Sequence, residues 1–572
     1  MKELLLGNAA VARACYEAGC CVASSYPGTP STEITQNISA YDEIYTEWAS
    51  NEKVAIEVAF GASLAGKRSF TGMKHVGLNV AADPLFTISY TGINAGMVIA
   101  VADDPGMHSS QNEQDSRHYA RAAKVPMLEP ADSSECLEFT KFAYDLSEKF
   151  DTPVLVRMCT RIAHSQSVVE VSERVEPPAK EYVKSAAKYV MMPGYAIVRH
   201  PIVEQRMRDL ADIAEDTFLN RVEMGGADMG IITSGTAYQY VKEVFGDRVS
   251  VLKLGMVHPL PAKLILDFAS KVKKTVVVEE LDSIIEDHCK KLGLNVTGKE
   301  LFPLTGELSP NIVADKLGEQ FNAGLVIEDE IPQRPPVMCA GCSHRGLFYT
   351  LSKKKITVLG DIGCYSLGAT PPLNSVDTTV CMGASISSLH GFMRAGGKNA
   401  VCVIGDSTFA HMGVNGLINI GYNGSDSTVI ILDNSITAMT GHQENPTTGY
   451  SIKGDKTGKM DIEALCKAVG IERVRVIDPN NLKQCEEAIT EELAAPGASV
   501  IITRRPCRLL KTSKINPPLV VDEEKCTGCA VCMRIGCPSI SVISNKAQID
   551  RTQCVGCRLC TQLCKFDAMV SS

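Results

Sequence analysis

The chain has 572 residues, which corresponds to roughly four domains of ~150 residues each. Hydrophobic residues make up 45% and charged residues 22%, as in globular proteins generally, which excludes a disordered, collagen-like or disulfide-stapled chain. The formal net charge of −9 argues against a nucleic-acid partner. Aromatic residues are few (6%) and glycines abundant (45), which favours helices packed closely on sheets over an all-β sandwich.

The N-terminal segment does not resemble an export signal. Its apolar run continues as an amphipathic helix over residues 7–18 and lacks an Ala-x-Ala-like cleavage site. Residues 85–102 form the longest uncharged stretch and reach the length at which a membrane span must be considered. Polar residues and Gly92 interrupt this stretch, so we predict a buried helix that leads into a strand. We therefore expect a soluble, cytoplasmic protein with no membrane partner.

Apolar strand-like runs alternate with helical patterns through most of the chain. Such alternation predicts an α/β protein whose parallel sheets are doubly wound, with helices on both faces. A Pro-rich, charged segment at 328–336 is a predicted linker. We expect four domains, at 1–190, 191–330 (beginning with a charged connector), 337–511 and 515–572.

Eight of the 22 cysteines lie between positions 526 and 564, in two runs of similar spacing. A Cys-x2-Cys-x2-Cys turn supplies three thiolates to one cubane cluster, and in two-cluster ferredoxins the fourth Cys of each run ligates the other cluster. Zinc sites normally use paired Cys-x2-Cys, and disulfides need an oxidising compartment, so both are poorer interpretations. We predict a ferredoxin-like α+β tail with two [4Fe–4S] clusters, one held by Cys526, Cys529, Cys532 and Cys564 and the other by Cys537, Cys554, Cys557 and Cys560.

Two buried strands in the third domain end in polar residues. One ends in Gly405-Asp406, and the next ends immediately before Asn434, 28 positions beyond Asp406. This spacing matches a strand–helix–strand unit, in which the carboxyl ends of adjacent parallel strands place both side chains at one edge. Together with the carbonyl of Ile436, they would leave three positions of an octahedral Mg²⁺ open for phosphate or water. The alternative is an ordinary turn before a helix.

Two Gly-rich turns in the same domain are suited to presenting backbone N–H groups to a diphosphate. The alternative for the first turn is a redox-active Cys pair, although no thioredoxin-like unit surrounds it. The cofactor-binding candidates in these turns are Cys339, Gly341 and Cys342 in the first, and Gly363 and Cys364 in the second.

Six segments are distinctive in combination: YPGTPSTE (26–33), WASNEKVAIEVAFGASLAG (48–66), MKHVGLNVAADP (73–84), VADDPGMHSSQNEQDSR (101–117), CAGC (339–342) and GDSTFAHMG (405–413). Together they resemble the 2-oxoacid:ferredoxin oxidoreductases, in particular the large (α) subunits of the indolepyruvate ferredoxin oxidoreductases. The resemblance covers essentially the whole chain. The strand-end pair also resembles the Gly-Asp-Gly…Asn-Asn motif of thiamine-diphosphate enzymes, with departures at Ser407 and Asp433.

This resemblance implies a thiamine diphosphate and Mg²⁺ site formed by a pyrimidine-binding first domain and a diphosphate-binding third domain, with Ser407 among the cofactor contacts. It implies that Glu52 hydrogen-bonds the aminopyrimidine, with Glu57 on the same helix as the reserve candidate. Without the resemblance, Glu52 would be read as a first-turn acid facing the helix dipole. Thr29 and Arg117 resemble the hydroxyl and guanidinium that bind the substrate carboxylate. The second domain resembles the carboxy-terminal domain of transketolase-like proteins, and we expect it to serve assembly.

The implied reaction is the oxidative decarboxylation of aryl 2-oxo acids, such as indolepyruvate and related arylpyruvates. Coenzyme A and oxidised ferredoxin are converted to aryl-acetyl-CoA and reduced ferredoxin, with release of CO₂. The resemblance also implies a smaller β subunit and an α2β2 assembly. Three alternatives stay open: another 2-oxoacid specificity, a non-oxidative thiamine decarboxylase, and an electron-transfer subunit with a lapsed thiamine site. The cysteine-rich tail argues against the second, and the two motif departures keep the third open.

Overall fold

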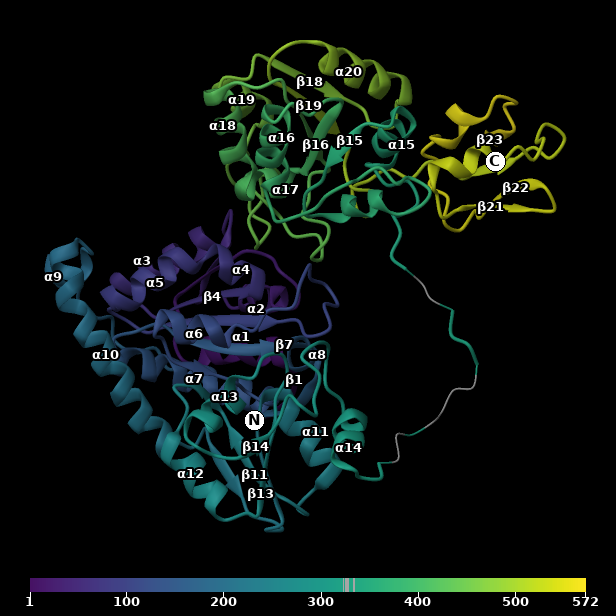
Figure 1. Ribbon diagram of the computed structural model, residues 1–572. Coiled ribbons are helices and arrows are strands. Elements are labelled where there is room, and N and C mark those ends of the chain that lie inside the picture. The colour runs from purple at the N-terminus through teal and green to yellow at the C-terminus, as the bar shows by residue number, and fades with distance from the viewer. Residues whose placement is uncertain (322–323, 325–328, 333–334, 572) are drawn as a thin grey trace. The chain divides into compact units, whose positions relative to one another are not determined.

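The computed structural model describes residues 1–321, 324, 329–332 and 335–571. It divides into two compact units, Met1–Asp329 and Glu330–Ser572 (Figure 1). The boundary falls within the predicted linker 328–336, part of which lies outside the described residues. None of the described helices is both long and apolar enough to cross a lipid bilayer.

A seven-stranded sheet forms the core of the first half of unit 1. Its strand order is β12-β6-β7-β5-β4-β2-β3, and every pairing is parallel except that of β12 with β6. Because β12 comes from the second predicted domain, the two predicted domains share this sheet. The strands are β2 (Val22–Ser25), β3 (Tyr45–Trp48), β4 (Ser69–Lys74), β5 (Met97–Asp103), β6 (Met127–Leu128), β7 (Val154–Cys159) and β12 (Met256–His258).

Helices cover both faces of this sheet, as the alternating pattern predicts. Val98 and Ala100 of β5 face one hydrophobic cluster, whereas Ile99 and Val101 face the other. The predicted helix at 7–18 is confirmed as α1, and the stretch 85–102 runs from α5 through Gly92 into β5. One face carries α1 (Gly7–Glu17), α2 (Thr32–Ile38) and α7 (Ser133–Phe150), and the other carries α3 (Glu52–Leu64), α4 (His75–Val80), α5 (Ala82–Thr91) and α6 (Arg117–Ala123).

A smaller five-stranded sheet, of order β14-β13-β10-β11-β9, completes unit 1. Only β9 is antiparallel to its neighbour. Its strands are β9 (Arg221–Glu223), β10 (Met229–Ser234), β11 (Ser250–Leu254), β13 (Lys274–Val278) and β14 (Val296–Thr297), with helices α11 (Gly235–Phe245), α12 (Ala262–Ser270), α13 (Ile284–Lys291) and α14 (Pro310–Leu317). The remaining elements of unit 1 are the antiparallel pair β1 (Lys2–Leu6) and β8 (Gln166–Glu170), with α8 (Thr160–His164), α9 (Ala186–Tyr189) and α10 (Pro193–Glu215).

Unit 2 begins with a wholly parallel sheet of order β15-β16-β17-β19-β18. Side chains of β16 alternate between two clusters, one formed with α15 and α20 and the other with α16, α18 and α19. The doubly wound α/β class is therefore confirmed. The strands are β15 (Thr357–Leu359), β16 (Ala400–Gly405), β17 (Thr428–Asp433), β18 (Arg473–Ile477) and β19 (Ser499–Arg504). The helices are α15 (Arg345–Lys354), α16 (Ala384–Arg394), α17 (Asp406–Thr408), α18 (Val414–Asn423), α19 (Ile462–Ala468) and α20 (Leu482–Ala494), with the short helix η1 (Cys364–Ala369) and the π-helical turn η2 (Phe409–Gly413).

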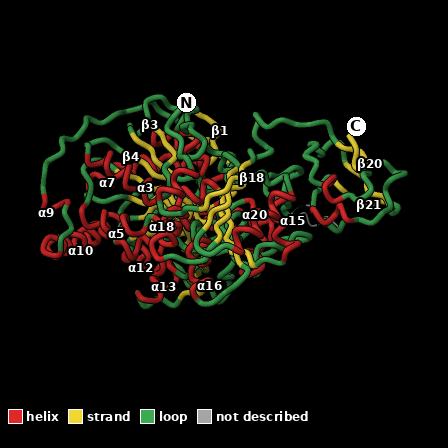
Figure 2. Tube along the Cα trace, turned by 90° about the horizontal axis from the view of Figure 1, so that it is seen from above, coloured by secondary structure: helices red, strands yellow, loops and turns green. Residues whose placement is uncertain are grey.

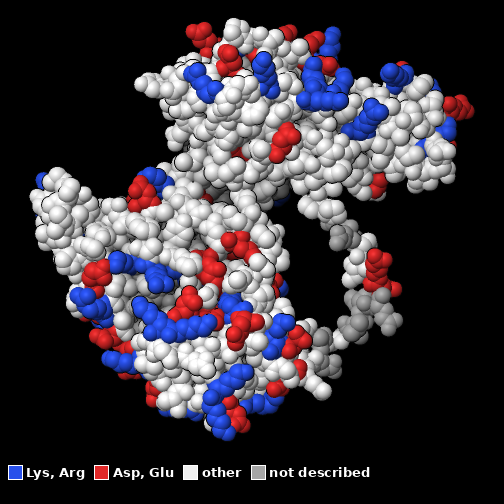
Figure 3. All heavy atoms as spheres, in the orientation of Figure 1, with Lys and Arg blue, Asp and Glu red and all other residues white. Residues whose placement is uncertain are grey.

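The carboxy-terminal tail of unit 2 is mostly loop (Figure 2). Two short antiparallel pairs, β20 with β23 and β21 with β22, enclose a core in which cysteines pack among aliphatic side chains. Acidic and basic side chains are interspersed over the face drawn in Figure 3. The tail elements are β20 (Leu519–Val521), η3 (Val531–Ile535), β21 (Ile540–Ile543), β22 (Lys546–Ile549), η4 (Cys560–Leu563) and β23 (Met569–Ser571).

Candidate active site

The carboxyl ends of β16 and β17 bring Asp406 and Asn434 together. The two strands are adjacent and parallel, so the chain leaves both at one edge of the sheet. Asp406 accepts hydrogen bonds from the backbone N–H groups of Ser407 (2.7 Å) and Ser435 (2.8 Å). Within the described part of the chain, no Lys or Arg forms an ion pair with this buried carboxylate.

This donor set fits a hard divalent cation. Burial, and after it the charge of Asp433, raises the pKa of Asp406 to about 7, which a bound cation would counteract. Asn434 Oδ1 accepts from the backbone N–H of Ile436 at 3.2 Å, so Ile436 belongs to the same turn. One carboxylate, one amide oxygen and a nearby carbonyl are the few oxygen ligands that protein-bound Mg²⁺ uses alongside phosphates.

Both departures from the thiamine-diphosphate motif are accommodated locally. The Ser407 hydroxyl accepts a hydrogen bond from the Thr437 hydroxyl at 2.8 Å. Asp433 lies opposite Arg504 on β19, and Arg504 Nε donates to its carboxylate at 2.8 Å. The extra acid therefore has its own counter-charge, and neither residue rules out the site.

A buried histidine that the sequence analysis did not single out borders the same turn. Asn434 Nδ2 donates to His344 Nε2 at 3.3 Å, and burial lowers the pKa of His344 to about 4, so the ring is neutral. Tyr365 packs edge-on against this ring, with centroids 5.9 Å apart. A Cβ at Gly363 or Gly405 would lie 2.2 or 2.8 Å from the Tyr365 ring, so both glycines are needed for its packing.

Four cysteine thiols gather at this edge of the sheet. Burial, followed by the charge of Cys507, raises the pKa of Cys364 to about 11. Burial raises the pKa of Cys342 to about 12, and the neighbouring Cys339 and Cys364 act in the same direction. The backbone N–H of Cys507 donates to the carbonyl of Asn434 at 2.8 Å. The sequence analysis missed Cys507, whose signal was its position just beyond a buried strand of the same sheet.

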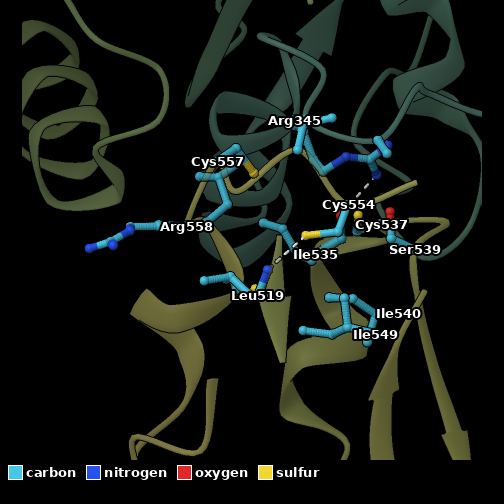
Figure 4. Close-up of a pocket in the computed structure, with 15 residues that line it drawn as sticks. Arg345, Leu519, Ile535, Cys537, Ser539, Ile540, Ile549, Cys554, Cys557 and Arg558 are labelled. Carbon is cyan, nitrogen blue, oxygen red and sulfur yellow. Dashed lines mark hydrogen bonds between the residues drawn. The ribbon is translucent and has the colours of Figure 1, made fainter. Parts of the chain in front are cut away.

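Each predicted set of cluster cysteines in the tail lines a single cavity. Among the described residues, no three His, Cys, Asp or Glu side chains converge as they would around one metal ion. One cavity is lined by Cys526, Cys529, Cys532 and Cys564, and the other, drawn in Figure 4, by Cys537, Cys554, Cys557 and Cys560.

Glu52 and Glu57 occupy different environments on α3. Glu52 begins the helix, which the side chain of Asn51 caps, and is only 4% exposed. A Cβ at Gly77 would lie 2.6 Å from the Glu52 carboxylate, so the glycine allows α4 to lie close to the Glu52 side chain. Glu57 is exposed and pairs with Lys53. Burial therefore favours Glu52 over the reserve candidate.

Thr29 lies half-buried in the loop that follows β2, next to an unexpected buried cation. A Cβ at the neighbouring Gly28 would lie 3.1 Å from Cγ of Lys74, the last residue of β4. Lys74 is 8% exposed, and its ammonium donates to the carbonyl of Ser109 at 2.8 Å. No ion pair of Lys74 exists among the described residues. Burial lowers its pKa, while nearby carboxylates, Glu52 among them, oppose that shift.

The structure gives Arg117, predicted to bind the substrate carboxylate, partners within the protein. Arg117 is 2% exposed, and each of its three side-chain nitrogens already donates a hydrogen bond. Nε donates to Asp115 at 2.9 Å, and Nη1 donates to Glu279 at 2.6 Å. Nη2 donates to Asp115 and to the carbonyls of Glu280 and Asp282. Arg117 therefore ties its helix to the loop after β13, and its charge is already paired with Asp115 and Glu279.

Comparison with known proteins identifies the family of this chain. Residues 13–224 match the family "Pyruvate flavodoxin/ferredoxin oxidoreductase, thiamine diP-bdg", and residues 361–503 match "Thiamine pyrophosphate enzyme, C-terminal TPP binding domain". Indolepyruvate oxidoreductase subunit IorA of Methanothermobacter thermautotrophicus is 41% identical over 99% of this chain and 97% of its own length. The subunit of the same name from Archaeoglobus fulgidus is 40% identical over 95% of this chain and 97% of its own length. The 2-oxoglutarate synthase subunit KorA of M. thermautotrophicus is 22% identical over 52% of this chain and 93% of its own length. The chain therefore belongs to the indolepyruvate oxidoreductase α-subunit (IorA) family and is an oxidoreductase with thiamine-diphosphate-binding domains.

Proposed function

We propose that this chain, together with a smaller β subunit in an α2β2 assembly, oxidatively decarboxylates indolepyruvate and related arylpyruvates. Coenzyme A accepts the acyl group and ferredoxin accepts the electrons, giving aryl-acetyl-CoA, CO₂ and reduced ferredoxin. The observation that carries the proposal is the presence in one chain of the Asp406–Asn434 turn and of two cavities each lined by four thiols. Thiamine diphosphate supplies an electron sink for decarboxylation, and iron–sulfur clusters carry single electrons away.

We assign the diphosphate end of the cofactor to the turn after β16 and β17. Asp406, Asn434 and the carbonyl of Ile436 would hold Mg²⁺, and the backbone around Gly405 and Ser407 would face the diphosphate. The buried, uncompensated carboxylate of Asp406 supports this assignment. Such a site orients the cofactor because the ion joins its phosphates to fixed oxygens on two strands.

The pyrimidine and substrate ends are assigned to residues of unit 1. Glu52 would accept the hydrogen bond of the aminopyrimidine, because it is buried at a helix start and Glu57 is not. Thr29 and Lys74 would receive the substrate carboxylate. Lys74 replaces Arg117 in this role because it is a buried cation with no carboxylate partner in the described structure. A buried carboxylate and a buried ammonium stabilise one another where either alone would be costly.

We further propose three clusters, two in the tail and one held by Cys339, Cys342, Cys364 and Cys507. Neighbouring thiols of this set contribute to the raised pKa values of Cys342, Cys364 and Cys507, which supports the third cluster. A Cβ at Gly341 would lie 2.2 Å from Val555, so the Cys339–Cys342 turn packs directly on the second cysteine run of the tail. Electrons from the Asp406 site would thus reach the tail through adjoining cysteine loops.

The test is a substrate comparison with anaerobically purified protein and its partner subunit. Reduction of a viologen dye is measured with indolepyruvate, phenylpyruvate, pyruvate and 2-oxoglutarate, each with and without coenzyme A. We expect the arylpyruvates to exceed the others and to require coenzyme A. Preference for 2-oxoglutarate or pyruvate would support another 2-oxoacid specificity, and aldehyde formation without dye reduction would indicate a non-oxidative decarboxylase. Absence of thiamine from the denatured protein would indicate a lapsed site.

A further inference from the structure

Arg345, the first residue of α15, directs a buried guanidinium at the cavity lined by Cys537, Cys554, Cys557 and Cys560 (Figure 4). It is 2% exposed, and its hydrogen-bond acceptors among the described residues are all backbone carbonyls. Nη1 donates to the carbonyls of Ile535 (3.1 Å) and Gly536, and Nη2 to those of Met338 (2.6 Å) and Cys339 (3.0 Å). No carboxylate in the described structure forms an ion pair with it.

A buried cation without an anion is unfavourable, because carbonyl dipoles replace only part of its lost hydration. Four thiolates around a [4Fe–4S] core that carries two positive charges leave a dianion, which would compensate a guanidinium. Arg345 itself lines this cavity, beside the four cysteines. Of the described residues that line the other cavity, none is charged.

We propose that Arg345 is the counter-charge of the cluster held by Cys537, Cys554, Cys557 and Cys560, and that it raises the reduction potential of this cluster above that of its neighbour. The proposal rests on the clusters of the proposed function. Reduction adds one electron and turns the dianion into a trianion, so a fixed cation stabilises the reduced form more than the oxidised form. The electron comes from the oxidation of the 2-oxo acid or, in the test below, from dithionite.

The hydrogen bonds of Arg345 also indicate which of the two tail clusters receives electrons first. Its guanidinium joins the carbonyls of Met338 and Cys339 to the tail loop that immediately precedes Cys537. The cluster beside Arg345 therefore adjoins the thiols near Asp406 and would be the first of the two tail clusters to accept an electron. A raised potential at that position favours electron entry into the tail.

Arg558 provides a matched control because it lines the same cavity only with its stem. Its side chain points away from the cysteines in Figure 4, is exposed, and donates to the hydroxyl of Ser571 at 2.9 Å. Water screens a charge in that position far more than it screens a buried one. R558M and R345M thus each remove one positive charge from the same cavity wall, one exposed and one buried.

The experiment is a potentiometric titration with dithionite and mediators, followed by electron paramagnetic resonance, on anaerobic wild type, R345M, R345K and R558M. In R345M we expect the potential of one tail cluster to fall, with a change in its reduction equilibrium on the order of tenfold, or 59 mV for one electron. The potential of the second tail cluster should be unchanged in R345M. R345K should recover most of the wild-type potential of the affected cluster, and R558M should have the potentials of the wild type. The affected signal is identified by its loss in C557S.

An unchanged potential in iron-replete R345M would overturn the proposal, as would an equal shift of both tail clusters. If R345M binds less iron than the wild type, R345K becomes the deciding variant, because lysine keeps the positive charge. An iron content and a reduction potential equal to those of the wild type in R345K would support the proposal, and a decrease of either would overturn it. The titration needs no 2-oxo acid, so a shifted potential in a protein inactive on arylpyruvates would refute the proposed function alone. Absence of cluster signals from the wild type would refute both.

Discussion

Replacing Lys74 with methionine tests the proposed substrate site most sharply. The side chain is buried, its stem lies along the Gly28 turn, and its ammonium donates to the carbonyl of Ser109. Methionine keeps the length and apolar stem of lysine and removes only the charge and the donors. The substrate carboxylate would then be buried without a cation, so the substitution should weaken substrate binding.

The size of the effect follows from the interaction that is lost. A hydrogen bond to a charged group contributes about 1.5–3 kcal/mol, so kcat/KM for phenylpyruvate should fall about 10- to 150-fold. Loss of the bond to Ser109 should lower the free energy of unfolding by only about 1 kcal/mol. K74R should recover part of the activity because it keeps the charge. K53M is the matched control, since Lys53 forms an exposed pair worth less than about 0.5 kcal/mol.

The assay is steady-state dye reduction at saturating coenzyme A, with thermal unfolding of each variant as a check. Most of the loss should appear in KM. The non-reacting analogue 3-phenylpropionate, which keeps the carboxylate, should inhibit K74M at least tenfold more weakly than it inhibits the wild type. A folded K74M whose KM and inhibition constant stay within twofold of wild type would refute the assignment.

Three further predictions concern other parts of the molecule. D406A should lose Mg²⁺-dependent thiamine diphosphate binding, measured by calorimetry, while keeping its iron; retained affinity would show that the ion lies elsewhere. C507S should contain less iron than C466S, by about the content of one cluster. C466S is the control because Cys466 is a buried thiol that belongs to none of the proposed clusters. Equal iron contents in the two variants would exclude the third cluster. Burial raises the pKa of Glu280 to about 7, so the native protein holds this proton more tightly than the unfolded chain and stability should fall as pH rises from about 5 to 7. In E280Q the free energy of unfolding, measured with denaturant, should not fall over this pH range and should exceed that of the wild type by about 1–3 kcal/mol at pH 8. If the free energies of unfolding of E280Q and the wild type change in parallel with pH, the prediction is wrong.

The sequence was sufficient to locate the Asp406–Asn434 turn because its determinants are local. Buried parallel strands appear as continuous apolar runs, and a short crossover between two of them places their carboxyl ends together. The grouping of the tail cysteines was likewise inferable, since the spacing of each run limits how its thiols can converge. Both inferences use elements separated by fewer than about 40 positions.

Features that depend on distant pairings could not be inferred. Arg117 and Glu279 are 162 positions apart, and nothing near Arg117 indicates that the loop after β13 supplies its partner. The antiparallel pairing of β12 with β6 joins two predicted domains through only a few residues, which carry no recognisable signal. Lys74 had a readable signal, because it is a charged residue at the end of a buried strand.

In the proposed reaction, oxidation of an arylpyruvate at a thiamine site reduces clusters bound by the same chain. Anaerobic holoenzyme mixed with indolepyruvate, frozen within one turnover and without any external electron acceptor, tests it by electron paramagnetic resonance. We predict a reduced-cluster signal in the wild type and its absence in D406A loaded with the same iron. A wild type that contains thiamine and iron, yet stays oxidised after mixing, would contradict the account.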